Sequence, residues 1–175
     1  MNRKLFTMLV LFAALAFPSC GEEDPVEKQE ERIDAYIKAK MTKNPGMKLS
    51  SDGNVHYLYT PGDTTVSVSA GDSVYFYYAG TLVTDTMRYF DTNEKALADA
   101  MKLNTGSKTF EPLGVTAGSG SLLPGLDIGL KMTHPGDRGD IIFNSDLGFG
   151  NRANGIVPPL SPLIFKVTIV RIRKK

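Results

Sequence analysis

From residue 54 onward the sequence alternates apolar and polar residues with a period of two, and this feature constrains the fold most strongly. The clearest stretches read NVHYLYT, TTVSVSA, SVYFYYAGTLV and MRYFDT, and they are rich in Val, Tyr, Phe and Thr. Successive side chains of a β-strand point to opposite faces, and β-branched and aromatic residues favour strands. The dipeptides Gly62-Asp63 and Gly71-Asp72 are typical of turns between strands. The pattern therefore predicts antiparallel strands, and GDIIFNS and PLIFKVTIVRI predict the last two.

Helical patterns flank or interrupt the predicted strands at three places. In EERIDAYIKAKMTKN, apolar residues recur at helical spacing, namely at Ile33, Tyr36, Ile37 and Met41. This spacing predicts a short amphipathic helix that lies against the domain or, alternatively, dimerises. NEKALADAMKLNTGSK has a helix-like composition and is typical of an insertion between strands, while LPGLDIGLKMT predicts a short helix that begins at Pro124. Many antiparallel strands with one short helix late in the chain place the fold in the α+β class.

The chain opens with a sequence typical of a secretory leader. Arg3 and Lys4 precede the apolar run LFTMLVLFAALAF, which is too short to span a bilayer as a helix and has the length of a signal-peptide core. Cys20 is the only cysteine, and the sequence AFPSC that ends with it resembles a bacterial lipobox. We therefore predict a lipoprotein signal peptide over residues 1–19, with lipidation of Cys20. The alternative is an ordinary signal peptide with an incidental cysteine.

The leader predicts an extracytoplasmic location in the cell envelope, with the chain held on the membrane through Cys20. Residues 20–45 combine the acidic tether GEEDPVEKQEE with the amphipathic helix, and residues 46–175 form one folded domain with an insertion at about 94–109. Loss of the leader leaves 18 basic and 19 acidic side chains. This balance gives no reason to expect a nucleic-acid partner.

Conventional catalytic and metal-binding signals are weak. The two histidines, His56 and His134, fall in a predicted strand and a predicted turn, without other ligand residues at metal spacing. No nucleophile-elbow motif occurs, and GSGSLLPG lacks the Lys-Ser/Thr ending of a phosphate loop. We therefore expect neither a metal nor a cofactor.

The remaining candidate for a site is apolar. The run GIVPPLSPLIF places three prolines among large apolar residues just before the last predicted strand. Because proline cannot donate to a sheet ladder, this run either buries an awkward turn or presents a preformed apolar wall to a ligand. Alternation along SVYFYY puts Tyr75 and Tyr77 on one face of a strand and Phe76 and Tyr78 on the other. Asp91 directly follows an aromatic residue at a strand end, so its carboxylate should be solvated or paired.

Five segments together resemble the FKBP-type peptidyl-prolyl isomerases. They read YYAGTL, YFDTN, LLPGLDIGLKMTHPGDRGDIIF, DLGFGN and GIVPPLSPLIFKVTIVRI, and they lie between about Gly71 and Ile172. The resemblance implies an antiparallel sheet wrapped around one short helix, to which this chain adds an N-terminal helix and an insertion. It also implies a peptidyl-prolyl cis-trans isomerase that acts on proline-containing polypeptides and assists the folding of extracytoplasmic proteins.

The same resemblance assigns residues to an apolar cleft that receives a substrate proline. Leu122 and Leu123 match the apolar pair before the helix, and Ile156 and Val157 match the lip formed by the proline-rich loop. Asp91 would orient neighbouring groups without transferring protons. The residues matched to the cleft are Tyr78, Phe90, Asp91, Leu122, Leu123, Leu126, Phe149, Ile156, Val157 and Phe165.

Three positions depart from the family pattern. Leu126 stands where the family usually has tryptophan, Phe149 where it has tyrosine, and Leu113 where it has phenylalanine. These changes remove contact area and a hydroxyl group, so we expect reduced isomerase activity. The insertion at 94–109 is longer than the corresponding family loop and could cover, extend or block the cleft. The alternative function is a non-catalytic binding module or a chaperone on the cell envelope.

Overall fold

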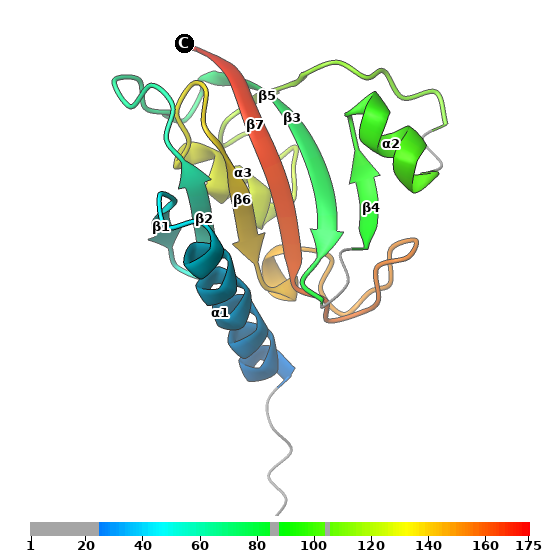
Figure 1. Cartoon of the computed structure of the whole chain (residues 1–175). Coiled ribbons are helices and arrows are strands. Elements are labelled where there is room, and N and C mark those ends of the chain that lie inside the picture. Colours follow the sequence, from blue (N-terminus) through cyan, green and yellow to red (C-terminus); the bar gives the residue numbers. More distant parts are fainter. Residues whose placement is uncertain (1–24, 85–87, 104–105) are drawn as a thin grey trace, which may run out of the picture.

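A seven-stranded antiparallel sheet forms the body of the fold (Figure 1). The structure is a computed structural model that describes residues 25–84, 88–103 and 106–175. In chain order its elements are α1 (Pro25–Lys43), β1 (Lys48–Asp52), β2 (Val55–Thr60), β3 (Ser73–Leu82), β4 (Tyr89–Thr92), α2 (Lys95–Met101), β5 (Leu113–Thr116), α3 (Pro124–Lys131), β6 (Arg138–Phe143), the 3-10 helix η1 (Ser145–Leu147) and β7 (Leu163–Arg173). The strands lie in the order β1-β2-β6-β7-β3-β4, and β5 pairs with the first half of β3. This architecture confirms the predicted α+β fold.

The longest strands, β3 and β7, pair along their whole length in the middle of the sheet. Burial alternates along β3, where Phe76 and Tyr78 are buried in the main core while Tyr75 and Tyr77 are partly exposed on the opposite face. The assignment of these aromatic residues to two faces is therefore confirmed, and the face with Tyr78 is the one that carries the candidate site.

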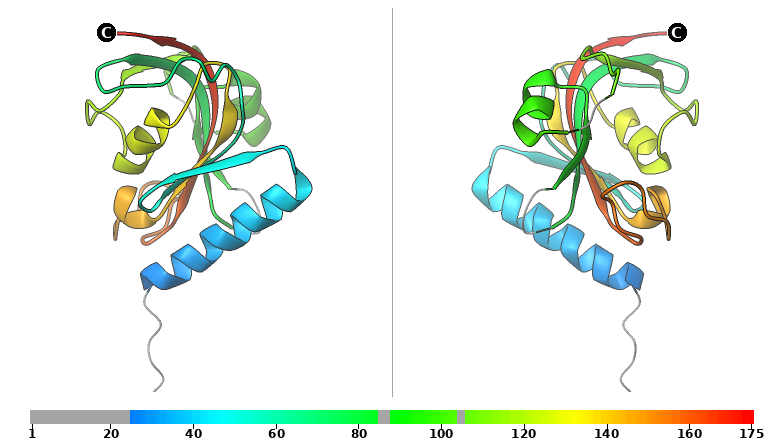
Figure 2. Two further views of the ribbon diagram at one scale, coloured as in Figure 1. Left: turned by 90° about the vertical axis from the view of Figure 1, so that its left-hand side faces the viewer. Right: turned by 90° about the vertical axis from the view of Figure 1, so that its right-hand side faces the viewer.

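Helix α3 packs against the face of the sheet that carries Phe76 and Tyr78 (Figure 2). Its predicted start at Pro124 is confirmed. A Cβ atom at Gly125 would lie 2.2 Å from Cγ of Phe143, and a Cβ atom at Gly129 would lie 2.2 Å from Cγ2 of Ile141. Only glycine lets the helix approach β6 so closely. The main core therefore lies between α3 and the sheet.

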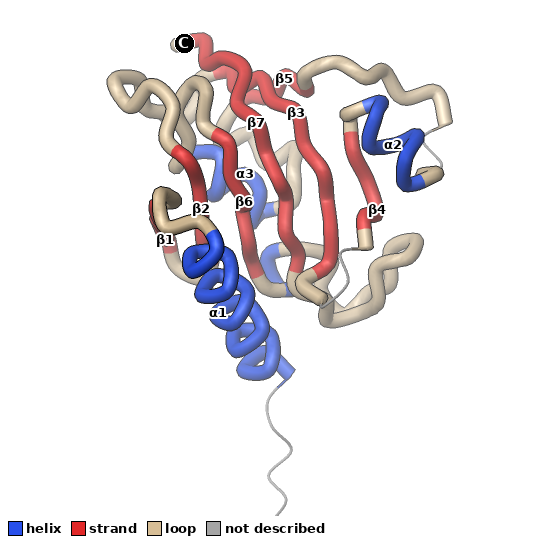
Figure 3. The backbone as a smooth tube through the Cα atoms, in the orientation of Figure 1, coloured by secondary structure: helices blue, strands red, loops and turns tan. Residues whose placement is uncertain are grey.

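Helix α1 covers part of the other face of the sheet (Figures 2 and 3). Ile33 and Ile37 pack against a second set of buried side chains, which consists of Leu58, Val83, Ile142 and Ile164. Close to this contact, the Tyr36 hydroxyl and the Lys40 ammonium both donate to Asp140 Oδ2, at 2.7 Å and 2.8 Å. The predicted amphipathic helix therefore docks on its own domain.

Two sequence predictions differ from the structure, one for the acidic tether and one for residues 64–70. The helix begins at Pro25 and buries Gln29, so the last part of the segment predicted as a solvated tether is helical. Residues 64–70 were predicted to form a strand, which is wrong, because none of the described strands pairs with them. The Ser69 N–H there donates to the Asp72 carboxylate instead, at 2.7 Å. Strands β1 and β5 were not predicted.

The predicted signal peptide and Cys20 lie outside the described residues. Within the described ranges, no helix combines the length and apolar character that are needed to cross a bilayer.

A buried carboxylate near the C-terminus should make stability depend on pH. Asp72 is buried and accepts hydrogen bonds from Lys174 Nζ at 2.5 Å, the Ser69 N–H and the Lys175 N–H. The bond from Lys174, followed by the backbone N–H groups, lowers the pKa of Asp72 to about 2. Because the pKa is lower in the folded state than the unfolded value of 3.8, the stabilisation is complete above pH 4 and is lost as the pH falls toward 2.

We therefore expect the difference in melting temperature between the wild type and Asp72→Asn to be large at pH 6 and small at pH 2.5. Thermal unfolding followed by circular dichroism at both pH values measures this difference. A gap of the same size at both values would show that the Asp72 charge does not stabilise the fold.

Candidate active site

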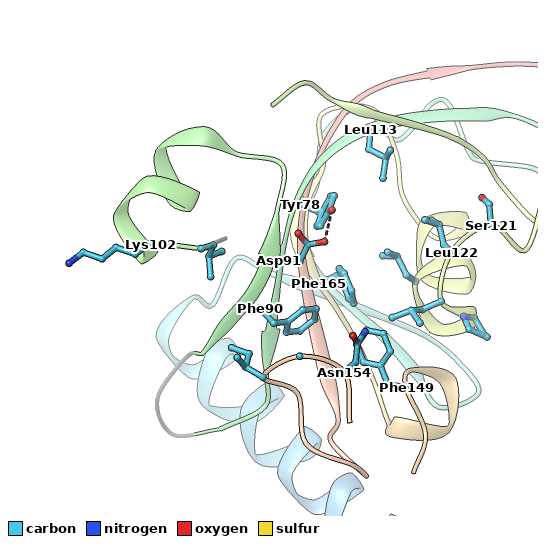
Figure 4. A pocket seen from close by; sticks show the side chains of 16 residues that line it. Tyr78, Phe90, Asp91, Lys102, Leu113, Ser121, Leu122, Phe149, Asn154 and Phe165 are labelled. Carbon is cyan, nitrogen blue, oxygen red and sulfur yellow. Dashed lines mark hydrogen bonds between the residues drawn. The ribbon is translucent and has the colours of Figure 1, made fainter. Parts of the chain in front are cut away.

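A cavity of about 830 Å³ opens on the side of the sheet that carries α3 (Figure 4). Its walls come from strands β3, β4 and β7, the start of α3, the loop before β7, and the insertion between β4 and β5. The lining residues are Tyr78, Phe90, Asp91, Lys102, Leu103, Leu113, Ser121, Leu122, Leu123, Pro124, Leu126, Phe149, Asn154, Gly155, Ile156 and Phe165. Nine of the ten residues assigned to the cleft from the sequence therefore lie around one cavity.

Aromatic rings form the part of the wall that belongs to the sheet. The ring of Phe90 meets Phe165 edge-on at a centroid distance of 5.7 Å and Phe149 edge-on at 6.1 Å. Tyr78 lies on the other side of Phe165, also at 6.1 Å. Phe90 lies over Gly80, where a Cβ atom would be 2.6 Å from its ring, so the glycine of YYAGTL makes room for this arrangement. Edge-to-face pairs contribute about 0.5–1.5 kcal/mol beyond burial, which favours a wall of fixed shape.

The proline-rich loop forms the lip of the cavity. Asn154 and Val157 exchange two backbone hydrogen bonds of 2.9 Å, and this tight turn contains Gly155 with φ of +58°. Ile156 at the tip is 49% exposed and lines the cavity, whereas Val157 is 1% exposed and belongs to the main core. Val157 therefore does not line the lip as the resemblance implied, because the turn directs neighbouring side chains to opposite sides. The loop both buries a turn and presents an apolar residue to the cavity.

The start of α3 closes the cavity on the side opposite the strands (Figure 4). Leu122, Leu123 and Pro124 line it there, and the buried side chain of Leu126 lies deeper in the same wall. Leu113, the third position that departs from the family pattern, lies at the rim and is exposed. All three departures, Leu126, Phe149 and Leu113, therefore line the cavity itself.

Asp91 is the only carboxylate among the described residues that line the cavity. It accepts a hydrogen bond of 2.8 Å from the Tyr78 hydroxyl and forms an ion pair with Lys108 of the insertion. The Lys108 ammonium also donates to the Tyr78 hydroxyl at 3.0 Å and lies 5.3 Å from the centre of its ring. The sequence predicted that Asp91 would be either solvated or paired, and the structure shows that it is paired. The sequence did not identify Lys108, because no local pattern distinguishes it from other lysines in the insertion.

These contacts shift the pKa values of both partners of Asp91. Burial is the largest effect on Tyr78 and raises the pKa of its hydroxyl, and the hydrogen bond to Asp91 raises it further. For Lys108, burial alone would lower the pKa, but hydrogen bonds to Asp91 and Tyr78 outweigh burial and raise the pKa above its ordinary value. Lys108 is therefore a cation at neutral pH.

The insertion is tied to the sheet at its neck by Asn93. The buried Asn93 side chain accepts the Tyr78 N–H at 2.7 Å and donates to the backbone oxygens of Glu111 at 2.8 Å and Phe76 at 3.2 Å. Beyond the neck, α2 lies beside β4, and Leu103 after it joins the cavity wall. Of the three possibilities that the sequence left open, the described part of the insertion extends the wall and leaves the cavity open (Figure 4).

Among the described residues, no group of three or more His, Cys, Asp or Glu side chains is placed to hold a metal ion. His56 hydrogen-bonds to Ser51, and His134 contacts the buried Asp137, so each histidine has a partner within the fold.

The geometry defines a class of proteins in which a half-open antiparallel sheet and a short helix enclose an aromatic cavity suited to a small apolar group. The chain belongs to the family described as FKBP-type peptidyl-prolyl cis-trans isomerase, whose profile matches residues 64–170. Members of this family isomerise prolyl peptide bonds and take proline-containing peptides as substrates. The family assignment made from the sequence is thereby confirmed.

Individual relatives are distant. The chain is 30% identical to FK506-binding protein 1A of Neurospora crassa, over 70% of this chain and 90% of that protein. It is 28% identical to FK506-binding protein 1 of Yarrowia lipolytica, over 64% of this chain and 91% of that protein. Among solved structures, FkpA from Escherichia coli superposes with a TM-score of 0.58 at 22% identity, and the match covers 85% of this chain and 61% of FkpA. The structural likeness establishes the fold.

Proposed function

We propose that this chain catalyses the cis-trans isomerisation of prolyl peptide bonds in extracytoplasmic proteins and so assists their folding. The observation that carries the proposal is the open cavity, in which nine residues matched to the family cleft surround a space of about 830 Å³. A prolyl ring is small and apolar, as the aromatic wall requires.

The chemistry needs no nucleophile. Resonance of the amide gives a peptide bond a rotational barrier of about 18–20 kcal/mol, and uncatalysed prolyl isomerisation takes tens of seconds or more. Tyr78, Phe90 and Phe165 would surround the proline and exclude water from the twisted amide, in which resonance is lost. Asp91, held by Tyr78, would orient the polar groups on one side of the cavity without transferring a proton.

The activity is expected to be lower than is usual for the family. Phe149 cannot donate the hydrogen bond that a tyrosine would make, and such a bond contributes about 0.5–1.5 kcal/mol. Leu126 and Leu113 replace aromatic side chains and offer less surface to the substrate. These substitutions should weaken the binding of the macrolide inhibitors of the family together with catalysis.

The direct test is a proline-peptide isomerisation assay on the purified chain, with Asp91→Ala as the comparison. Catalysis that is reduced in Asp91→Ala would support the proposal. Undetectable catalysis in both proteins would favour the second candidate, a non-catalytic binding module or chaperone. The observation that favours this candidate is the replacement of three cavity residues of the family pattern by Leu113, Leu126 and Phe149.

We further propose that the chain is a lipoprotein of the cell envelope, anchored to the membrane through Cys20. The support is the leader sequence with its single cysteine at the expected cleavage site. Several acyl chains on one residue hold a protein stably on a membrane, since each buried CH₂ contributes about 0.8 kcal/mol. We expect Cys20→Ala to move the protein from the membrane fraction to the soluble fraction after cell fractionation. Continued membrane association of Cys20→Ala would contradict the anchor.

A further inference from the structure

We propose that Lys108, which the insertion supplies, sets the charge specificity of the cavity by neutralising Asp91, so that clients with an acidic residue next to the proline are accepted. The inference rests on the proposed function, because it names the class of prolyl substrate that the same site takes. It assigns Lys108 as a specificity-determining residue.

The contacts of Lys108 show that its ammonium belongs to the site. It forms an ion pair with Asp91, donates to the Tyr78 hydroxyl at 3.0 Å, and donates to the Thr92 backbone oxygen at 3.3 Å. All three acceptors lie on β3 or β4, whereas Lys108 comes from the far side of the insertion. Three acceptors around one ammonium group fix its position, and charge-assisted bonds are stronger than neutral ones.

Removal of Lys108 would change the charge of the cavity from balanced to negative. Among the described residues that line the cavity, Asp91 is the only carboxylate and Lys102 the only cation, and the Lys102 side chain points away from the cavity (Figure 4). Without Lys108, the Asp91 charge would face the substrate with two neutral partners, the Tyr78 hydroxyl and the Thr92 N–H, each donating at 2.8 Å. Side chains of Asp91 and Lys108 are 42% and 27% exposed, so solvent would screen this charge in part but not fully.

The two ends of the insertion that supplies Lys108 are fastened to the sheet. Asn93 joins both ends of the insertion to β3 through the Phe76 oxygen and the Glu111 oxygen. Inside the insertion, the Lys95 ammonium pairs with Asp99 at 2.8 Å and lies 5.5 Å from the centre of the Phe110 ring. The cation is therefore part of a defined structure before a substrate binds.

The test compares three peptides that differ only in the residue before proline, with Glu, Gln or Lys at that position. The isomerisation kcat/KM of each is measured for the wild type, Lys108→Met and Lys108→Arg. The matched control is Lys95→Met, which removes the same charge from the same insertion but from an exposed side chain that does not line the cavity.

We expect the wild type to treat the Glu and Gln peptides within about twofold of each other. Lys108→Met should lower the ratio of Glu to Gln by about tenfold, the effect of one partly screened charge at close range, and should favour the Lys peptide. Lys108→Arg and Lys95→Met should keep the wild-type ratio. If Lys108 were merely structural, Lys108→Met would reduce all three values equally, and the inference would be overturned.

Peptide binding separates failure of the inference from failure of the proposed function. If the wild type shows no catalysis, the proposed function fails, and dissociation constants for the same three peptides, measured by fluorescence titration, then test Lys108 by the same ratio. An unchanged binding ratio in Lys108→Met, or no binding of any peptide to the wild type, would overturn the inference.

Discussion

Replacement of Asp137 by alanine is expected to lower the free energy of unfolding by about 3–5 kcal/mol. The Asp137 side chain is fully buried and accepts hydrogen bonds from the Gly62 N–H at 2.7 Å, the His134 N–H at 2.8 Å and the Tyr57 hydroxyl at 3.2 Å. His134 Nδ1 also lies 3.3 Å from the same carboxylate. Without it, several donors would be left unpaired in or near the core, and each buried one costs about 1–3 kcal/mol.

The same carboxylate joins three parts of the fold. It links the turn after β2, the turn before β6, and the buried ring of Tyr57, which stacks on Tyr59 at 4.5 Å. Burial, followed by the charge of Asp137, raises the pKa of Tyr57, so this hydroxyl remains a donor.

Urea unfolding followed by circular dichroism measures the loss in Asp137→Ala. The matched control is Asp63→Ala, which removes an exposed carboxylate that bonds only to Thr65 in its own turn and should cost less than about 1 kcal/mol. If Asp137→Ala also lost less than about 1 kcal/mol, the buried hydrogen bonds of Asp137 would not contribute the expected unfolding free energy.

Replacement of Phe165 by alanine is expected to reduce both stability and catalysis. The Phe165 ring is buried, stacks on Phe143 at 5.9 Å, and meets Phe90 and Tyr78 in the cavity wall. Truncation of a buried phenylalanine costs about 3–5 kcal/mol of unfolding free energy. Because the lost ring also forms part of the cavity wall, the proposed function implies that kcat/KM falls by at least about tenfold, which corresponds to about 1.4 kcal/mol.

A second phenylalanine separates the two effects. Phe76 on β3 is buried in the same core as Phe165 but does not line the cavity. Phe76→Ala should therefore lose similar stability and keep more of its catalysis. Both variants are assayed at a temperature at which circular dichroism shows them folded. Equal loss of kcat/KM in the two variants would mean that Phe165 acts through stability alone.

The sequence predicted most of the strands because alternation is a local signal. At residues 64–70 the alternation predicts a strand, but tertiary contacts determine the structure. The Ser69 N–H there bonds to the Asp72 side chain, and the segment pairs with none of the described strands. Strands β1 and β5 escaped prediction because neither has a buried face: both are almost wholly exposed, so no alternation of apolar residues marks them.

The site was predictable to the extent that its residues occupy family motifs. Nine motif residues line one cavity, but Val157 is turned into the core by the two hydrogen bonds of its turn, which the motif does not specify. Lys108 could not be predicted because its ion pair with Asp91 depends on the path of the insertion through space. Contacts between segments without a shared pattern emerge only from the three-dimensional structure.

Because the Asn93 side chain bonds to both Tyr78 and Glu111, residues 94–110 form a segment that could be exchanged as a unit. Both of its ends are fastened to the same strand, so changes in the length or composition of the intervening chain need not disturb β3 or β4. The entropy of closing such a loop grows only by about 0.6 kcal/mol for each doubling of its length. Exchange of this segment would therefore change the part of the cavity wall that Leu103 supplies and the charge that Lys108 supplies, while the walls built by the sheet, α3 and the proline-rich loop keep their shape.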